Sequence, residues 1–98
     1  MSAYTVFTRE KTLDESELKV YHESAKRSLE GHPVKPLASY GHQETLEGTP
    51  SEGTVILEFP DMEAAKAWYN DPKTIATREH RLKGGTYRGV LVQGVQKA

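Results

Sequence analysis

Arg81 is a candidate for holding an anion, because a guanidinium can bind a carboxylate or a phosphate through two parallel hydrogen bonds. Arg78 and Arg88 lie close to it in the sequence and make this part of the chain basic. A structural ion pair, for example with Glu47 or Glu58, is the alternative interpretation of the same arginine.

Two further side chains are candidates for moving a proton. His42 follows a predicted strand, and a histidine suits the role of general base near neutral pH. Glu58 lies within another predicted strand, where a half-buried carboxylate acts as a base with a raised pKa or pairs with an arginine. We therefore predict His42 and Glu58 as catalytic residues lining one chamber with Arg81. The residues predicted to contact a ligand are Arg81, Tyr40, Arg88 and Trp68, although Trp68 would also suit the core.

The sequence argues against several other kinds of site. The chain has no cysteine, so it has no thiolate nucleophile and no cysteine-ligated metal. The four histidines lack a metal-binding spacing, and we assign His22 to packing beside a helix. Gly84-Gly85 lacks the pattern of a phosphate-binding loop. We expect neither a metal nor a cofactor.

Length and charge restrict the class of protein. Ninety-eight residues predict one domain, over residues 1–98, with a single two-layer core. The chain has 13 basic and 14 acidic residues and a net charge of −1, which disfavours nucleic acid or an anionic membrane as a partner. It shows no signal-peptide pattern and no apolar run of the ~20 residues that a membrane span needs. We expect a cytoplasmic protein.

The segment 54–69 predicts a strand followed directly by a helix. The strand is mostly apolar and Pro60 ends it, because proline has no N–H to donate. Asp61 is a suitable N-cap, and the helix that follows ends in Trp68 and Tyr69.

Patterns elsewhere complete the set of elements. Strands are expected over residues 3–8, 34–43 and 87–94, and a short helix over residues 73–82. A longer helix begins near residues 12–14 and ends before Gly31, with an apolar stripe formed by Leu18, Tyr21, Ala25 and Leu29. Pro36 places the second strand at a sheet edge.

The element order is β-α-β-β-α-β with a helical insertion before the last strand. That order predicts an α+β, ferredoxin-like antiparallel sheet with its helices on one face and strands one and three at its centre. Alternation in the third strand groups Val55, Leu57 and Phe59 on one face and Thr54, Ile56 and Glu58 on the other. The fourth strand groups Val90 and Val92 beside Arg88 on one face, and Tyr87, Leu91 and Gln93 on the other. Because both faces carry too many apolar residues to leave in water, we predict a homodimer that covers the face without helices, whichever set it carries. A monomer is the alternative.

The chain contains a set of short motifs that are informative together: Leu46-Glu-Gly48, Ile56-Leu-Glu-Phe-Pro60, Ala67-Trp-Tyr69, Asp71-Pro72, Arg81 and Arg88-Gly-Val-Leu-Val-Gln-Gly94. Together they resemble the bacterial family called domain of unknown function 1330, from about Tyr4 to Gly94. The resemblance implies a dimeric α+β barrel, a group that includes small monooxygenases, haem-degrading enzymes, muconolactone isomerase-like proteins and polyketide cyclases. The chain departs from the pattern near Thr74, where a tyrosine is expected, and at Ser39 or Tyr40, where a basic residue is expected.

These observations favour a homodimer that binds a small, partly apolar acid or carbonyl compound in a barrel pocket. Cofactor-free isomerisation or cyclisation is the reaction expected of the available His, Glu, Tyr and Arg side chains. A non-catalytic module that binds a small molecule, or a purely structural dimer, is the alternative function.

Overall fold

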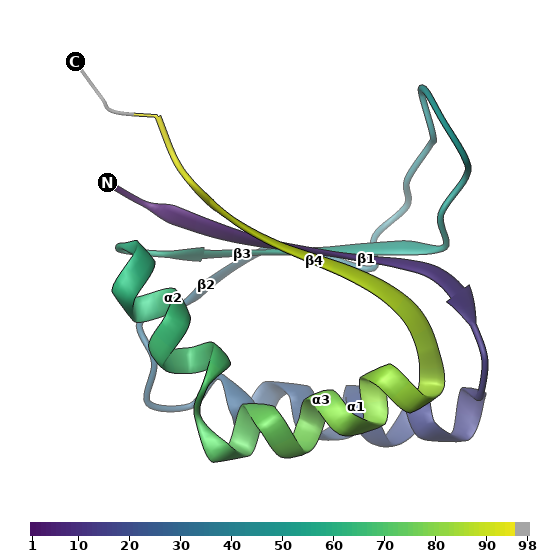
Figure 1. Ribbon diagram of the computed structural model, residues 1–98, viewed down its shortest axis with the longest axis horizontal. Helices are drawn as coiled ribbons and strands as arrows, with labels where there is room; N and C mark the ends of the chain where they lie inside the picture. The colour runs from purple at the N-terminus through teal and green to yellow at the C-terminus, as the bar shows by residue number, and fades with distance from the viewer. Residues whose placement is uncertain (96–98) are drawn as a thin grey trace.

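The computed structural model describes residues 1–95 and has the predicted ferredoxin-like α+β fold (Figure 1). The elements in chain order are β1 (Ala3–Thr12), α1 (Glu15–Ser28), β2 (Lys35–Ser39), β3 (Gly53–Phe59), α2 (Met62–Tyr69), α3 (Pro72–Gly84) and β4 (Gly85–Gln93). The strands form one antiparallel sheet in the order β2-β3-β1-β4. Strands one and three are therefore central, as predicted, and α3 is the predicted helical insertion.

The helices cover one face of the sheet and leave the other face without a protein layer (Figure 1). Alternation along the strands separates the two faces. On the helix side, a core cluster of buried residues joins the sheet to α2: Phe7, Val55, Leu57, Phe59, Ala65 and Trp68. The alternation in β3 and β4 thus follows the prediction.

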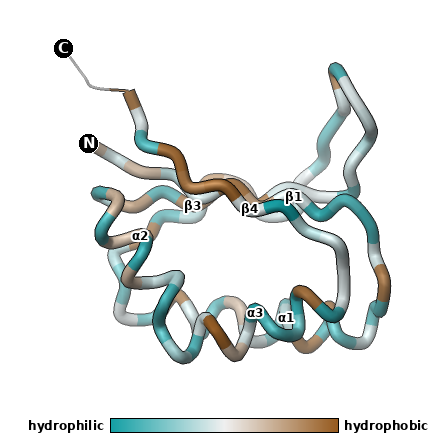
Figure 2. Tube along the Cα trace, in the orientation of Figure 1, coloured by the Kyte–Doolittle hydropathy of each residue, from teal (hydrophilic) through white to brown (hydrophobic). Residues whose placement is uncertain are grey.

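The open face combines apolar and charged side chains. Val90 and Val92 are 50% and 48% exposed. Val6 of β1 pairs with Ile56 on one side and with Val90 on the other, so these three side chains form one row across the sheet. The Tyr4 hydroxyl donates to Glu58 Oε2 at 3.0 Å on this face. Figure 2 shows the hydrophobic stretch along β4 that contributes to it.

Element boundaries differ from the predictions mainly at strand ends. β1 continues to Thr12 instead of ending at Thr8, because its last residues still pair with β4 across a register shift between Arg9 and Lys11. β2 stops at Ser39, well before Gln43, because Tyr40 adopts a positive φ of 53° that a strand cannot continue through. Pro36 lies on the edge strand, as predicted.

Three aspartates define where the helices begin. Asp14, Asp61 and Asp71 each accept a hydrogen bond from a backbone N–H in the first turn of α1, α2 and α3, which satisfies donors that have no partner within the helix. The bounds of α2 and α3 therefore lie within two residues of the predicted ones. No helix within residues 1–95 is long and apolar enough to cross a membrane.

Candidate functional site

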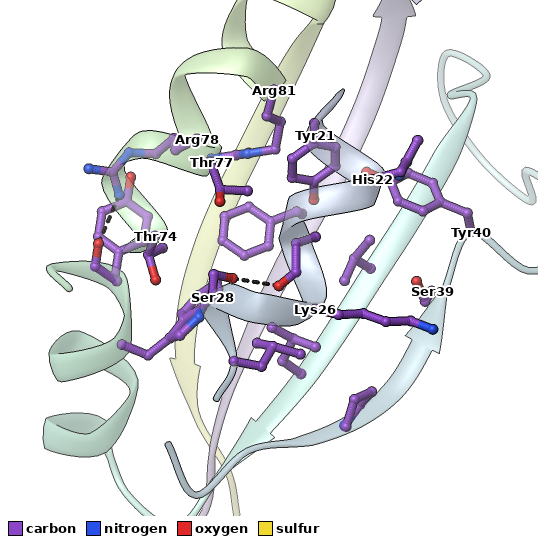
Figure 3. A pocket seen from close by; sticks show the side chains of 18 residues that line it. Tyr21, His22, Lys26, Ser28, Ser39, Tyr40, Thr74, Thr77, Arg78 and Arg81 are labelled. Carbon is purple, nitrogen blue, oxygen red and sulfur yellow. Dashed lines mark hydrogen bonds between the residues drawn. The ribbon is translucent and has the colours of Figure 1, made fainter. Parts of the chain in front are cut away.

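A cavity of about 260 Å³ lies between the helices and the sheet (Figure 3). Its apolar lining comes from Phe7, Ala25, Leu29, Pro36, Val55, Leu57 and Trp68, and its polar lining comes from Tyr21, His22, Lys26, Ser28, Ser39, Tyr40, Tyr69, Thr74, Thr77, Arg78 and Arg81. A mostly apolar wall with a few polar groups is typical of a small-molecule site. The volume is slightly below the usual ~300–1,000 Å³, which favours a small ligand.

Arg81 lies on the inner side of α3 and is only 6% exposed. Thr74 and Thr77 precede it at helical spacing, and all three are buried and line the cavity. The Cζ atom of Arg81 lies 4.6 Å from the ring centroid of Phe7 and 5.0 Å from that of Tyr87, within the range of cation–π attraction. Figure 3 shows Arg81 beside Thr77 and Arg78.

No carboxylate neutralises Arg81 within residues 1–95. Its guanidinium makes neither an ion pair nor a side-chain hydrogen bond there, so the structural ion pair considered from the sequence is absent from the described part of the chain. Glu58 points to the opposite face of the sheet, where it bonds Tyr4, and Glu47 is exposed in the loop between β2 and β3.

The charged residues around the cavity are all basic. Arg78 donates to the Tyr69 carbonyl at 3.0 Å, with its Cζ 4.0 Å from the Tyr69 ring centroid. Lys26 is the third cation, and the lining described within residues 1–95 contains no aspartate and no glutamate. Because these charges share one sign, the cavity attracts an anion.

Tyr40 closes the end of the cavity near β2. Its hydroxyl lies 2.7 Å from the Tyr87 hydroxyl, and burial raises the pKa of Tyr40 well above its ordinary value. Burial likewise raises the pKa of Tyr21, although Tyr40 and the Arg81 charge act in the opposite direction. The Tyr40 ring rests on Gly53, where an added Cβ would come within 2.5 Å of it. These phenols are therefore protonated at neutral pH and can donate hydrogen bonds.

His22 is a site residue that the sequence analysis missed. It lines the rim of the cavity from α1, where it remains exposed to solvent, and its ring meets that of Tyr40 edge to face at 5.0 Å. Partial burial, and then the Arg9 guanidinium, lower the pKa of His22, so its neutral form predominates at pH 7. The only indication in the sequence that His22 belongs to the site was its position directly after Tyr21, a residue of the apolar helix stripe that also lines the cavity.

Two buried polar atoms of the lining residues lack a partner within residues 1–95. They are the indole Nε1 of Trp68 and the Oγ1 of Thr74. Buried polar groups are nearly always hydrogen-bonded, so these two atoms are exceptions, and neither is accessible to solvent in this structure.

The six residues predicted from the sequence do not share one chamber. Arg81, Tyr40 and Trp68 line the cavity. Glu58 and Arg88 lie on the open face, because their register with Tyr4 and Thr8 points them away from the helices. His42 is in the loop after β2, with a side chain that is 85% exposed and 3.4 Å from Glu44. The expected grouping of His42 and Glu58 with Arg81 is therefore wrong, since strand alternation and the loop separate them.

Comparisons with known proteins agree with this fold. Residues 2–95 match the family model described as "Domain of unknown function (DUF1330)". No curated protein matches the chain significantly.

Three solved structures illustrate the likeness in fold. A protein of unknown function from Rhodopseudomonas palustris has a TM-score of 0.74 at 13% identity, covering 98% of this chain and 84% of its own. A dimeric ferredoxin-like protein of unknown function from Jannaschia gives 0.68 at 12% identity, with 96% and 100% covered. SnoaB, a cofactor-independent oxygenase from Streptomyces nogalater, gives 0.59 at 12% identity, with 98% and 95% covered. At these identities the likeness shows the fold alone.

Proposed function

The chain belongs to the DUF1330 family, whose description names no reaction, and we propose that it binds a small, partly apolar carboxylic acid in the cavity between helices and sheet. Arg81 holds the carboxylate, and the aromatic and aliphatic wall holds the remainder of the molecule. The observation that carries this proposal is a buried guanidinium that has no acidic partner among residues 1–95, in a cavity whose described lining carries only basic charges.

The energetics of burial support an anionic ligand. Removing a charge from water is unfavourable unless a counter-charge or hydrogen bonds compensate for it. The rings of Phe7 and Tyr87 compensate in part, because a cation–π contact contributes only about 0.5–2 kcal/mol. A carboxylate bound in bidentate fashion would supply the missing counter-charge.

The open sheet face supports a homodimer as the working form. Exposed Val90 and Val92 adjoin Ile56 and Tyr4 on the face opposite α1, α2 and α3 (Figure 1). A second copy of the same face would bury this surface with two-fold symmetry, and the similar protein from Jannaschia is described as dimeric. In such a dimer Glu58 and Arg88 lie in the interior of the barrel, apart from the cavity at Arg81.

His22 and Tyr40 extend the proposal from binding to a reaction without a cofactor. A neutral imidazole can accept a proton, and a phenol with a raised pKa can donate one. Their rings are 5.0 Å apart at one end of the cavity, which suits proton transfer on a bound acid, as in isomerisation or cyclisation. The fold neighbour SnoaB is described as a cofactor-independent oxygenase, which supports chemistry without a cofactor in a fold of this kind. A module that binds the acid without converting it is the alternative.

Binding is tested with small aromatic and aliphatic carboxylates, each beside its neutral amide, by thermal shift and calorimetry. A ligand that binds only the folded state raises its stability by RT ln(1 + [L]/Kd). We expect carboxylates to bind and amides to fail. Arg81→Lys should weaken binding at least tenfold because it keeps the charge and loses the two-pronged geometry, whereas Arg88→Lys, on the other face, should bind normally. Equal binding of acids and amides, or equal losses in the two variants, would refute the proposal.

Catalysis is tested with the acids that bind. In deuterated buffer, NMR should show deuterium entering the position next to the carboxylate of a substrate, and His22→Gln should slow this exchange without abolishing binding. Binding without exchange would identify the chain as a binding module.

A further inference from the structure

A second cavity of about 270 Å³ lies next to the first, between α2 and strands β1 and β4. Its lining contains Lys66, an exposed residue of α2, together with mostly apolar residues: Thr5, Phe7, Ala65, Tyr69, Gly89, Val90 and Leu91.

Phe7 and Tyr69 line both cavities and thus form the wall between them. Phe7 also carries the Arg81 guanidinium on its ring, 4.6 Å from Cζ to centroid. Gly89 lies opposite Phe7 on β4, and an added Cβ there would come within 2.8 Å of the Phe7 ring. The absence of a side chain at Gly89 therefore provides the room that the ring occupies.

The second cavity differs from the first in its chemistry. Lys66, which is exposed, is its only charged residue among those described. Its buried polar atom, Thr5 Oγ1, has no hydrogen-bond partner within residues 1–95. The first cavity thus offers a buried cation, and the second offers mostly apolar surface with the exposed Lys66 at its edge. A ligand that occupies both places its charge at Arg81, because an exposed ammonium such as that of Lys66 binds an anion only weakly.

We propose, as an inference that rests on the proposed function, that the ligand is an elongated monocarboxylic acid whose apolar tail passes Phe7 into the second cavity. The carboxylate binds Arg81 in the first cavity, and the Phe7 ring turns aside to let the tail reach Ala65 and Leu91. The two spaces then act as head and tail subsites of one site, because the Phe7 ring lines both and its rotation joins them.

The test measures the affinity of ω-phenylalkanoates of increasing chain length by calorimetry. Once the chain is long enough to pass Phe7, each methylene buried should tighten binding about fourfold. Ala65→Leu fills the second cavity and should remove this gain for long acids while leaving short acids unchanged. Leu91→Phe fills the same space from β4 and replaces Ala65→Leu in this test if Ala65→Leu does not fold. Ala25→Leu, which fills the first cavity, is the matched control and should weaken short and long acids alike.

The outcomes separate this inference from the proposed function. Affinity that does not rise with chain length, while short acids still bind through Arg81, overturns the tail subsite alone. A length-dependent gain that persists in both filling variants also overturns it, because the tail then lies elsewhere. If no acid binds, or Arg81→Lys has no effect, the proposed function and the tail subsite fail together.

Discussion

The Cζ atom of Arg81 lies 4.6 Å from the ring centroid of Phe7, so a cation near the end of α3 rests on an aromatic ring at the centre of the sheet. This contact places the charge in the interior, while the described part of the chain offers it no acidic partner. Such an arrangement is unfavourable for stability and favourable for binding an anion.

Replacing Arg81 by methionine separates these two effects. An apolar side chain of similar length removes the cost of burying an unpaired charge and forfeits the cation–π contacts of about 0.5–2 kcal/mol. We expect the free energy of unfolding of Arg81→Met to be within about 1 kcal/mol of the wild type or higher, with acid binding lost. Urea denaturation measures the first effect and calorimetry the second. A loss of more than ~3 kcal/mol would mark Arg81 as a structural residue.

The hydroxyl pair of Tyr40 and Tyr87 predicts a small, specific loss of stability. Tyr87→Phe removes the 2.7 Å hydrogen bond to Tyr40, which should lower the free energy of unfolding by about 1 kcal/mol. Tyr69→Phe is the control, since Tyr69 is 39% exposed. Equal losses in the two variants, measured by urea denaturation, would show that the pair is not what stabilises this end of the cavity.

His22 should titrate below the ordinary histidine pKa of 6.5, because partial burial and the Arg9 guanidinium disfavour its charged form. The folded state therefore binds this proton less tightly than the unfolded state does. Below about pH 6.5 protonation favours unfolding, so the contribution of His22 to stability falls as the pH falls. NMR titration of the His22 ring should show the lowered pKa, and its return to about 6.5 in urea. A value above 6.5 in the folded protein would contradict the neutral-base role.

The open face gives a prediction about assembly. Light scattering of the wild type should yield about twice the chain mass of 11.0 kDa. Ile56→Lys should produce monomers, because an unpaired charge in a buried interface costs several kcal/mol. Ile75→Lys, on α3 and 40% exposed, should leave the dimer intact. A monomeric wild type, or a dimer that tolerates Ile56→Lys, would rule out this interface.

The sequence predicted the architecture well because local signals determine it. The apolar run that ends at Pro60 and the cap at Asp61 lie within two residues of the observed boundaries. The helix expected over residues 73–82 likewise begins and ends within two residues of α3. Pro36 identified the edge strand for a physical reason, the missing N–H. The predicted strand ends were less accurate. The end of β2, for example, depends on the positive φ of Tyr40, and no residue pattern around Tyr40 indicates that conformation.

The site was harder to predict because it depends on which segments meet in space. Strand alternation correctly grouped Ile56 with Glu58, but it does not reveal which face carries the ligand cavity, so Glu58 was joined to Arg81 in error. His42 and His22 have the same chemistry in the sequence. Only the packing of α1 against the sheet brings His22 to Tyr40, whereas His42 lies in an exposed loop.

A crystal structure of the protein with a bound phenylalkanoate tests the central claim most directly. Both carboxylate oxygens should lie within about 2.7–3.2 Å of the Arg81 guanidinium nitrogens, with the hydrocarbon part between the helices and the sheet. A carboxylate bound at Arg88 on the open face, or at Lys26 with the guanidinium of Arg81 left unpaired, would contradict it.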